Sequence, residues 1–234
     1  MQPPSAPPPP DLSTERRSPL YIAPFEGEFA CDVTVLFDEN GHVYFADERP
    51  EDRDVDGLLW ERWGGTPTGS LDWAAHHPGR QCEVMDGRPL CGVHKGEPDR
   101  DERGTLWLLH ADENAQALLT LSNSITTATP AVCVPCARRA LRACRELQRG
   151  FIALRVREAP VIGVRGTLYS PTEPPLPNQV VRFGDDALHR LVARQLMREL
   201  INAELDETTL TASDFPAAGP AGAVLPGPRP VWGC

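Results

Sequence analysis

The chain has 234 residues, enough for one domain or two small ones, and 41% of them are hydrophobic. Its 33 acidic residues outnumber 23 lysines and arginines, so the formal net charge is −10, which argues against binding nucleic acid through overall charge. No apolar run approaches the ~20 residues that a membrane-spanning helix needs, so we predict no membrane partner.

The amino-terminal segment and the cysteines indicate the cellular compartment in which the protein is expected. Met1 is followed by prolines rather than by a basic segment and an apolar segment, so we expect no secretory signal peptide. The chain has 7 cysteines, and two metal-like pairs occur among its cysteines and histidines, a pattern that favours a reducing compartment. We therefore expect a cytoplasmic protein.

The first clear element along the chain is a hairpin. Residues 31–37 and 42–46 alternate apolar and polar side chains around a turn that ends in Asn40-Gly41, which predicts two paired strands. The acidic run over residues 47–56 that follows is typical of a solvated loop.

Two further segments precede the cysteine pairs. Residues 57–63 bring Leu59, Trp60 and Trp63 together at helical spacing, which predicts packing in the core. Residues 73–77 are expected to form a short helix that leads toward the first cysteine pair.

The centre of the chain contains two pairs of metal-ligand residues. Two residues separate Cys91 from His94, and two residues separate Cys133 from Cys136. Structural zinc takes four sulfur and nitrogen ligands of this kind in a tetrahedron. Gly96 follows the first pair and suits a turn that needs a positive φ. We predict a zinc ion held by three thiolates and one neutral imidazole.

The second pair is expected to run directly into a helix over residues 137–148. Cys136 would then lie in the first helical turn, where backbone N–H groups and the helix dipole favour a thiolate. Between the pairs, residues 105–110 and 116–122 are predicted strands of a hairpin. Two ligand pairs joined by a hairpin and followed by a helix are the arrangement of a treble-clef zinc module.

Other interpretations of the cysteines stay open. The second pair also has the spacing of a redox dithiol, although no βαβ pattern precedes it, and all four side chains also suit ordinary buried thiols with a surface histidine. Cys82 is an alternative fourth ligand in place of His94. Cys144 lies about two helical turns after Cys136, where we expect a small core residue.

Strands are predicted again after the helix. Residues 124–130 form an expected polar loop before the second pair, and residues 151–156 and 161–169 are predicted strands. Gly163 and Gly166 within the later strand indicate a bulge or a close approach of two backbones.

The last predicted element is a long helix over residues 185–205, after a loop over residues 171–177. Asp185 and Asp186 would lie at its amino terminus, as the helix dipole prefers. An apolar stripe recurs at the helical period. Its residues are Leu188, Leu191, Val192, Leu196 and Leu200.

These elements predict an α+β protein of small antiparallel strand pairs, with a central treble-clef-like zinc module and a C-terminal amphipathic helix between disordered ends. The expected division of the chain has four parts. They are a disordered proline-rich tail over residues 1–19, a hairpin-bearing region over 20–80, the zinc-module core over 81–205 and a disordered tail over 206–234.

The pattern resembles a set of actinobacterial, phage-associated proteins of unknown function. The shared motifs are the first ligand pair at residues 91–96, a Gly-Thr-Leu-Trp strand at 104–109, Pro-x-Val-Cys-x-x-Cys-Ala-Arg-x-Ala at 130–140, the strand pair at 155–169 and Leu-Val-x-x-Gln-Leu-x-Arg-Glu-Leu at 191–200. This chain departs from them at His94, where such sequences usually carry cysteine. The resemblance implies a Cys/His zinc core but no activity.

The first functional hypothesis is a non-catalytic, zinc-stabilised adaptor. Four protein ligands leave no open position for water, as in structural zinc sites. The helix after the second pair would present arginines to an acidic protein surface, including the chain's own acidic first half, or to nucleic acid phosphates. These arginines are Arg138, Arg139, Arg142, Arg145 and Arg149.

The second hypothesis is a divergent metal-dependent nuclease of the HNH type, which also uses a treble clef. His110, at the end of a predicted strand, would be the general base, and Asn123 would follow on the next strand. Ala137 occupies the position where such an enzyme carries a metal-binding histidine. We therefore expect that the protein is not an enzyme and leave the nuclease as the alternative.

Overall fold

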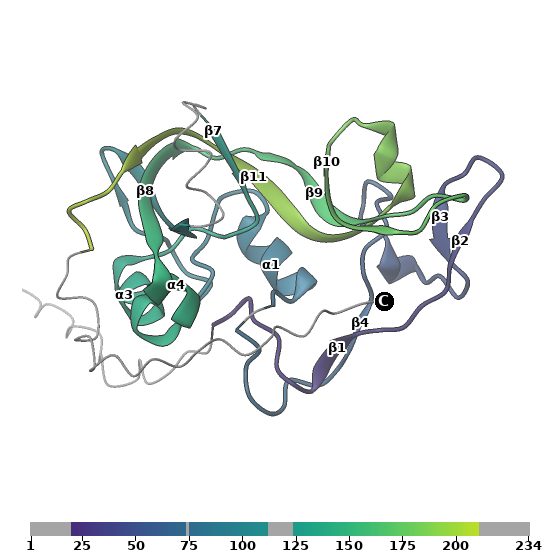
Figure 1. The fold of residues 1–234 in the computed structure, drawn as a ribbon, viewed down its shortest axis with the longest axis horizontal. Coiled ribbons are helices and arrows are strands. Elements are labelled where there is room, and N and C mark those ends of the chain that lie inside the picture. The colour runs from purple at the N-terminus through teal and green to yellow at the C-terminus, as the bar shows by residue number, and fades with distance from the viewer. Residues whose placement is uncertain (1–19, 74, 112–123, 211–234) are drawn as a thin grey trace, which may run out of the picture.

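The fold is organised around two long antiparallel lines of strand, which lie side by side across the molecule (Figure 1). The computed structural model describes residues 20–73, 75–111 and 124–210. The strands of its main sheet are β5 Arg100–Asp101, β6 Gly104–His110, β7 Ser124–Thr127, β8 Phe151–Glu158, β9 Val161–Leu168, β10 Leu176–Arg182 and β11 Leu191–Leu205.

Strands β8 and β9 form one bent line along β11. Leu154 lies opposite Leu205 at one end and Leu168 lies opposite Leu191 at the other, so both strands run antiparallel to β11. Pro160 separates them because it has no backbone N–H for the ladder, but its carbonyl accepts a hydrogen bond from the Glu199 N–H at 3.0 Å. The pairing with β11 therefore continues past the proline.

The other strands add to the edges of this pair. The order is β10-β9-β11-β8-β6-β5, and β7 pairs with β11. Arg198 of β11 lies opposite both Thr127 and Val161, so β7 occupies the edge of β11 that faces away from β9.

The predicted strands over 105–110, 151–156 and 161–169 are confirmed. The predicted loop over 124–130 is wrong in part, since its first residues form β7.

The C-terminal helix predicted over residues 185–205 is wrong. The segment forms a short 3-10 turn, η3 Asp186–Arg190, followed by β11. Its Leu, Met, Arg and Glu residues are good helix formers, but strand pairing on both edges outweighs this weak local preference. All residues of β11 from 191 to 198 except Arg194 are buried, so its buried positions do not alternate as they do in a strand with one covered face.

The last two residues of the loop predicted over residues 171–177 begin the edge strand β10, which was not predicted. Its residues are almost all exposed and include Pro177, so the segment has little apolar alternation to indicate a strand. Pairing with β9 supplies what the sequence pattern lacks.

The amino-terminal part packs against one end of the sheet. The predicted hairpin is confirmed as β2 Val35–Phe37 paired with β3 Val43–Phe45. The residues predicted at helical spacing over 57–63 are not helical: the Ala193 N–H of β11 donates to the Leu59 carbonyl, and the Glu61 N–H donates to the Ala193 carbonyl, each at 2.8 Å. The remaining small elements are β1 Glu28–Ala30, η2 Pro50–Asp52 and β4 Trp63–Gly65.

Three helices of the described residues accompany the sheet. They are α1 Pro78–Met85, α3 Val134–Ala143 and α4 Arg145–Arg149. Helix α1 begins just after the predicted short helix over 73–77 and packs on β11, where the buried Gln81 side chain hydrogen-bonds both the N–H and the carbonyl of Leu196 at 3.0 Å. The helix predicted over 137–148 is interrupted at Cys144, whose extended backbone separates α3 from α4. None of the helices in the described ranges combines the length and apolar character that crossing a membrane requires.

Replacement of Gly163 by alanine is expected to lower the free energy of unfolding by about 1–3 kcal/mol. A Cβ atom there would overlap the Val181 carbonyl of β10, in agreement with the predicted close approach. Urea denaturation measures the change. Gly79→Ala in α1 is the control, because its Cβ would meet the His77 ring at an ordinary 3.6 Å, and we expect a gain below about 1 kcal/mol. A Gly163→Ala variant as stable as the wild type would contradict the close packing of β9 and β10.

Candidate metal centre

The four predicted ligands converge on one point. One potential ligand atom from each of Cys91, His94, Cys133 and Cys136 lies within 4.8 Å of the other three. The His94 Nδ1 atom is 3.5 Å from the Cys136 sulfur and 3.8 Å from the Cys133 sulfur. On one tetrahedral zinc ion, a sulfur donor and a nitrogen donor lie about 3.6 Å apart. The cluster therefore fits a single bound metal ion.

The first ligand pair lies on a tight turn. The Cys91 N–H donates to the Gly96 carbonyl at 2.8 Å, and the Lys95 N–H donates to the Cys91 carbonyl at 2.9 Å. The residue with positive φ in this turn is Lys95, at 59°, and not Gly96 as predicted. Gly96 is needed for space instead, because a Cβ there would lie 2.5 Å from the Nε2 atom of His94.

The second ligand pair begins helix α3, as predicted. Cys133 is the residue before the first helical turn, and Cys136 lies within that turn. The Ala137 N–H donates to the Cys133 carbonyl at 2.9 Å, which begins the helical hydrogen bonds. Pro135 fits here because the N–H groups of a first turn have no partner within the helix.

Backbone hydrogen bonds hold the two pairs together. The Gly92 N–H donates to the Ala131 carbonyl at 3.0 Å, and the Val132 N–H donates to the Leu106 carbonyl of β6 at 3.0 Å. The strand predicted over 116–122 lies outside the described residues, so the hairpin of a treble clef stays a prediction. The two ligand pairs nevertheless share one backbone framework with β6.

The three thiols affect one another's ionisation. Hydrogen bonds with the side chains of Cys133 and Cys136, and with the backbone N–H groups of Cys133 and Val93, lower the pKa of Cys91 despite its burial. Hydrogen bonds with Cys133 and Cys91 raise the pKa of Cys136. Three thiolates this close repel one another, and a bound divalent cation allows all three to be deprotonated together.

Arg139 was predicted as part of a binding face, but it also contacts the cluster. Its Nη2 atom donates to the Cys136 sulfur at 3.7 Å. A guanidinium here offsets part of the negative charge that three thiolates leave on a divalent ion. The signal in the sequence was its position three residues after Cys136, one helical turn further along.

The alternative ligand and the predicted core cysteine lie elsewhere. Cys82 belongs to α1 and packs with residues of β9 and β11, and burial raises its pKa to about 12. Cys144 packs against the apolar cluster that α3 and α4 form with β6, as predicted. Among the described residues, His94 rather than Cys82 completes the cluster.

The residues of the nuclease alternative are only partly described. His110 ends β6, opposite Phe151 of β8, and lines an apolar cavity of about 430 Å³ together with His76. Burial lowers the pKa of His76 to about 4, and Gln195 hydrogen-bonds its Nδ1 atom at 2.9 Å. Asn123 lies outside the described residues, so the nuclease site stays a prediction.

The predicted arginine face follows directly from the metal cluster. Arg138, Arg142, Arg145 and Arg149 are exposed, and Arg139 is half-buried. The Arg149 guanidinium is paired with Glu146 at 2.8 Å.

Comparisons with family models, with curated proteins and with solved structures found no match for this chain, so the interpretation of the site rests on its geometry alone.

Proposed function

We propose that the protein is a non-catalytic binding module stabilised by a structural zinc ion. The observation that carries the proposal is the convergence of three sulfurs and one imidazole nitrogen within 4.8 Å. Sulfur and nitrogen donors at tetrahedral spacing suit zinc better than magnesium or calcium, which prefer oxygen. Four protein ligands complete the coordination of the ion and leave no position for a reactive water.

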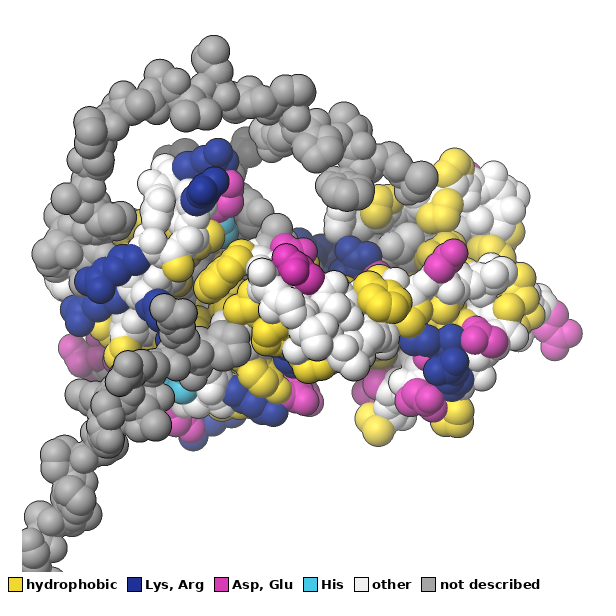
Figure 2. All heavy atoms as spheres, turned by 90° about the horizontal axis from the view of Figure 1, so that it is seen from below, with side chains coloured by type: hydrophobic (Ala, Val, Ile, Leu, Met, Phe, Trp, Pro, Cys, Tyr) yellow, Lys and Arg dark blue, Asp and Glu magenta, His cyan; other side chains and the backbone are white. Residues whose placement is uncertain are grey.

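The proposed binding surface is the arginine face, which we define as Arg138, Arg139, Arg142, Arg145 and Arg149. Zinc would fix the start of α3 and so the direction in which this face points. Basic side chains gather at the end of the molecule that carries α3 and α4 (Figure 2). Guanidinium groups bind carboxylates in a bidentate manner, so we propose an acidic protein surface as the partner.

Two measurements test the zinc and the surface. Metal analysis of the purified chain is expected to find one zinc per molecule, and cobalt substitution is expected to give thiolate-to-metal absorption. For the surface, poly-L-glutamate is the probe, and Arg142→Gln with Arg145→Gln is expected to weaken its binding by about tenfold or more. Arg157→Gln with Arg182→Gln removes the same charge from the sheet and is expected to have a smaller effect.

Duplex DNA tests the nucleic-acid alternative in the same assay. Stronger, salt-dependent binding of DNA than of poly-L-glutamate would replace the acidic protein partner with nucleic acid. Cleavage of plasmid DNA in the presence of Mg²⁺, lost in a His110→Ala variant, would replace the binding module with the nuclease.

Replacement of Gly96 by alanine is expected to weaken zinc affinity by about 10- to 100-fold, because the new Cβ would displace the His94 ring. Competition with a chromophoric chelator measures the affinity. Gly87→Ala is the control for backbone strain at a turn glycine, since its φ of 55° disfavours alanine while its Cβ would meet nothing within 4 Å. Unchanged affinity in the Gly96→Ala variant would contradict His94 as a ligand.

A further inference from the structure

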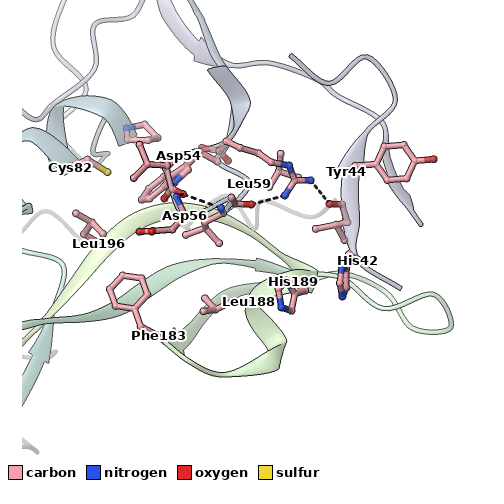
Figure 3. A pocket seen from close by; sticks show the side chains of 18 of the residues that line it. His42, Tyr44, Asp54, Asp56, Leu59, Cys82, Phe183, Leu188, His189 and Leu196 are labelled. Carbon is pink, nitrogen blue, oxygen red and sulfur yellow. Dashed lines mark hydrogen bonds between the residues drawn. The ribbon is translucent and has the colours of Figure 1, made fainter. Parts of the chain in front are cut away.

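A cleft of about 1380 Å³ opens between the amino-terminal loops and the sheet end that carries η3 (Figure 3). Part of its lining is apolar: Leu59 and Leu196 are buried, and the Phe183 side chain is 50% exposed. In Figure 3, Asp54 and Asp56 lie on the wall opposite Phe183. The cleft therefore combines an apolar surface with carboxylates.

Most carboxylates of this cleft have no cationic partner. Asp54 accepts hydrogen bonds from an indole and from backbone N–H groups, and Asp185 accepts one from a backbone N–H. Glu51, Asp56 and Asp186 are exposed and form no ion pair with any residue that the structure describes. We define these five residues as the acidic cleft. Their uncompensated charge favours a cationic occupant.

The arginine face carries the complementary charge. Arg142 and Arg145 are exposed, and neither forms an ion pair within the described part of the chain. Figure 1 places α3 and α4 at one end of the molecule and η3 with the β2–β3 hairpin at the opposite end. The two surfaces therefore cannot meet within one molecule.

We propose that the acidic cleft of one molecule receives the arginine face of a second copy, in a head-to-tail contact. This inference rests on the proposed function, because it names the acidic surface that the arginine face binds. The net charge of −10 opposes non-specific association, so the contact depends on local complementarity between the two ends. Two different surfaces in contact form a heterologous interface, which can repeat from molecule to molecule.

Sedimentation equilibrium tests this contact with the full, zinc-loaded chain. At about 0.01 M salt, where the Debye length is about 30 Å, the average mass is expected to rise with concentration above 25.7 kDa. At about 1 M salt, where that length is about 3 Å, the protein is expected to be monomeric. Monomeric protein at low salt up to the highest soluble concentration would overturn the proposal.

Two variants test the direction of the contact. The cleft variant carries Glu51→Gln, Asp56→Asn and Asp186→Asn, and the arginine variant carries Arg142→Gln and Arg145→Gln. Each is expected to be monomeric at low salt by itself. Mixed together, they are expected to form a one-to-one dimer, because one keeps the arginine face and the other keeps the cleft. A mixture that stays monomeric, or either variant associating alone like the wild type, would overturn the head-to-tail contact.

A matched control and a separate readout complete the test. The variant Glu102→Gln, Glu158→Gln and Glu207→Gln removes three exposed carboxylates outside the cleft and is expected to associate like the wild type. Binding of poly-L-glutamate by the cleft variant reports on the arginine face alone. If that binding persists while the wild-type protein does not self-associate at low salt, the head-to-tail contact fails and the proposed function stands.

Discussion

Removal of the proposed zinc ion is expected to lower the melting temperature of the protein by at least about 10 °C. Apparent binding free energies of structural zinc in small modules are about 10–16 kcal/mol, and that energy stabilises the fold because the unfolded chain has no formed site. Losing even about 5 kcal/mol shifts the melting temperature of a chain of this size by about 10–20 °C. Calorimetry with and without a zinc chelator measures the shift.

The ligand variant Cys136→Ser is expected to reproduce the effect of the chelator and to be insensitive to it. Cys31→Ser is the matched control, because Cys31 is a free cysteine outside the metal cluster, and we expect its melting temperature to keep the full response to chelation. A protein whose melting temperature does not respond to chelation, although it is loaded with zinc at the start, would contradict a structural role for the ion.

The second large effect is expected at a buried ion pair that the sequence analysis did not identify. Arg155 of β8 is 2% exposed and Asp206, just after β11, is 4% exposed. The Arg155 Nε atom donates to the Asp206 carboxylate at 2.7 Å, and the Arg155 Nη1 atom lies 2.6 Å from the Asp99 carboxylate. Arg155 therefore links β8 both to the residue after β11 and to Asp99, which precedes β5.

Replacement of Arg155 by methionine is expected to lower the free energy of unfolding by about 3–5 kcal/mol, because the buried Asp206 carboxylate would lose its nearer cation and keep only Arg103, at 3.4 Å. The neighbouring variant Arg157→Met is the control. Arg157 is exposed and lies 3.8 Å from Glu204, so we expect a loss of at most about 1 kcal/mol. Equal losses in the two variants, measured by urea denaturation, would contradict the importance of the buried pair.

The ion pair of Arg155 and Asp206 also makes the free energy of unfolding depend on pH. Burial raises the pKa of Asp206, but hydrogen bonds from Thr209 and Arg155 outweigh burial and hold that pKa well below its ordinary value of 3.8. The ionised carboxylate therefore stabilises the fold fully above the unfolded-state pKa of about 3.9, and this contribution is lost as the pH falls toward the lower folded-state pKa. Asp206→Asn is expected to remove this part of the acid sensitivity between about pH 5 and pH 2, measured by unfolding across that range.

The sequence by itself determined the four residues of the candidate metal centre and the local elements around them. Two-residue spacing lets a tight turn or a first helical turn direct both side chains of a pair at one point, so Cys91, His94, Cys133 and Cys136 could be identified without the fold. The hairpin of β2 and β3 was equally predictable, because an Asn-Gly turn between alternating segments is a local signal.

Only the tertiary structure decided the state of residues 191–205, the pairing of Arg155 with Asp206 and the acidic cleft. A segment rich in Leu, Met, Arg and Glu has a weak preference for helix, and backbone hydrogen bonds to β7, β8 and β9 outweigh it. The ion pair and the cleft join residues far apart in the chain. Contacts between residues at such separations produce no periodic pattern in the sequence from which they could be predicted.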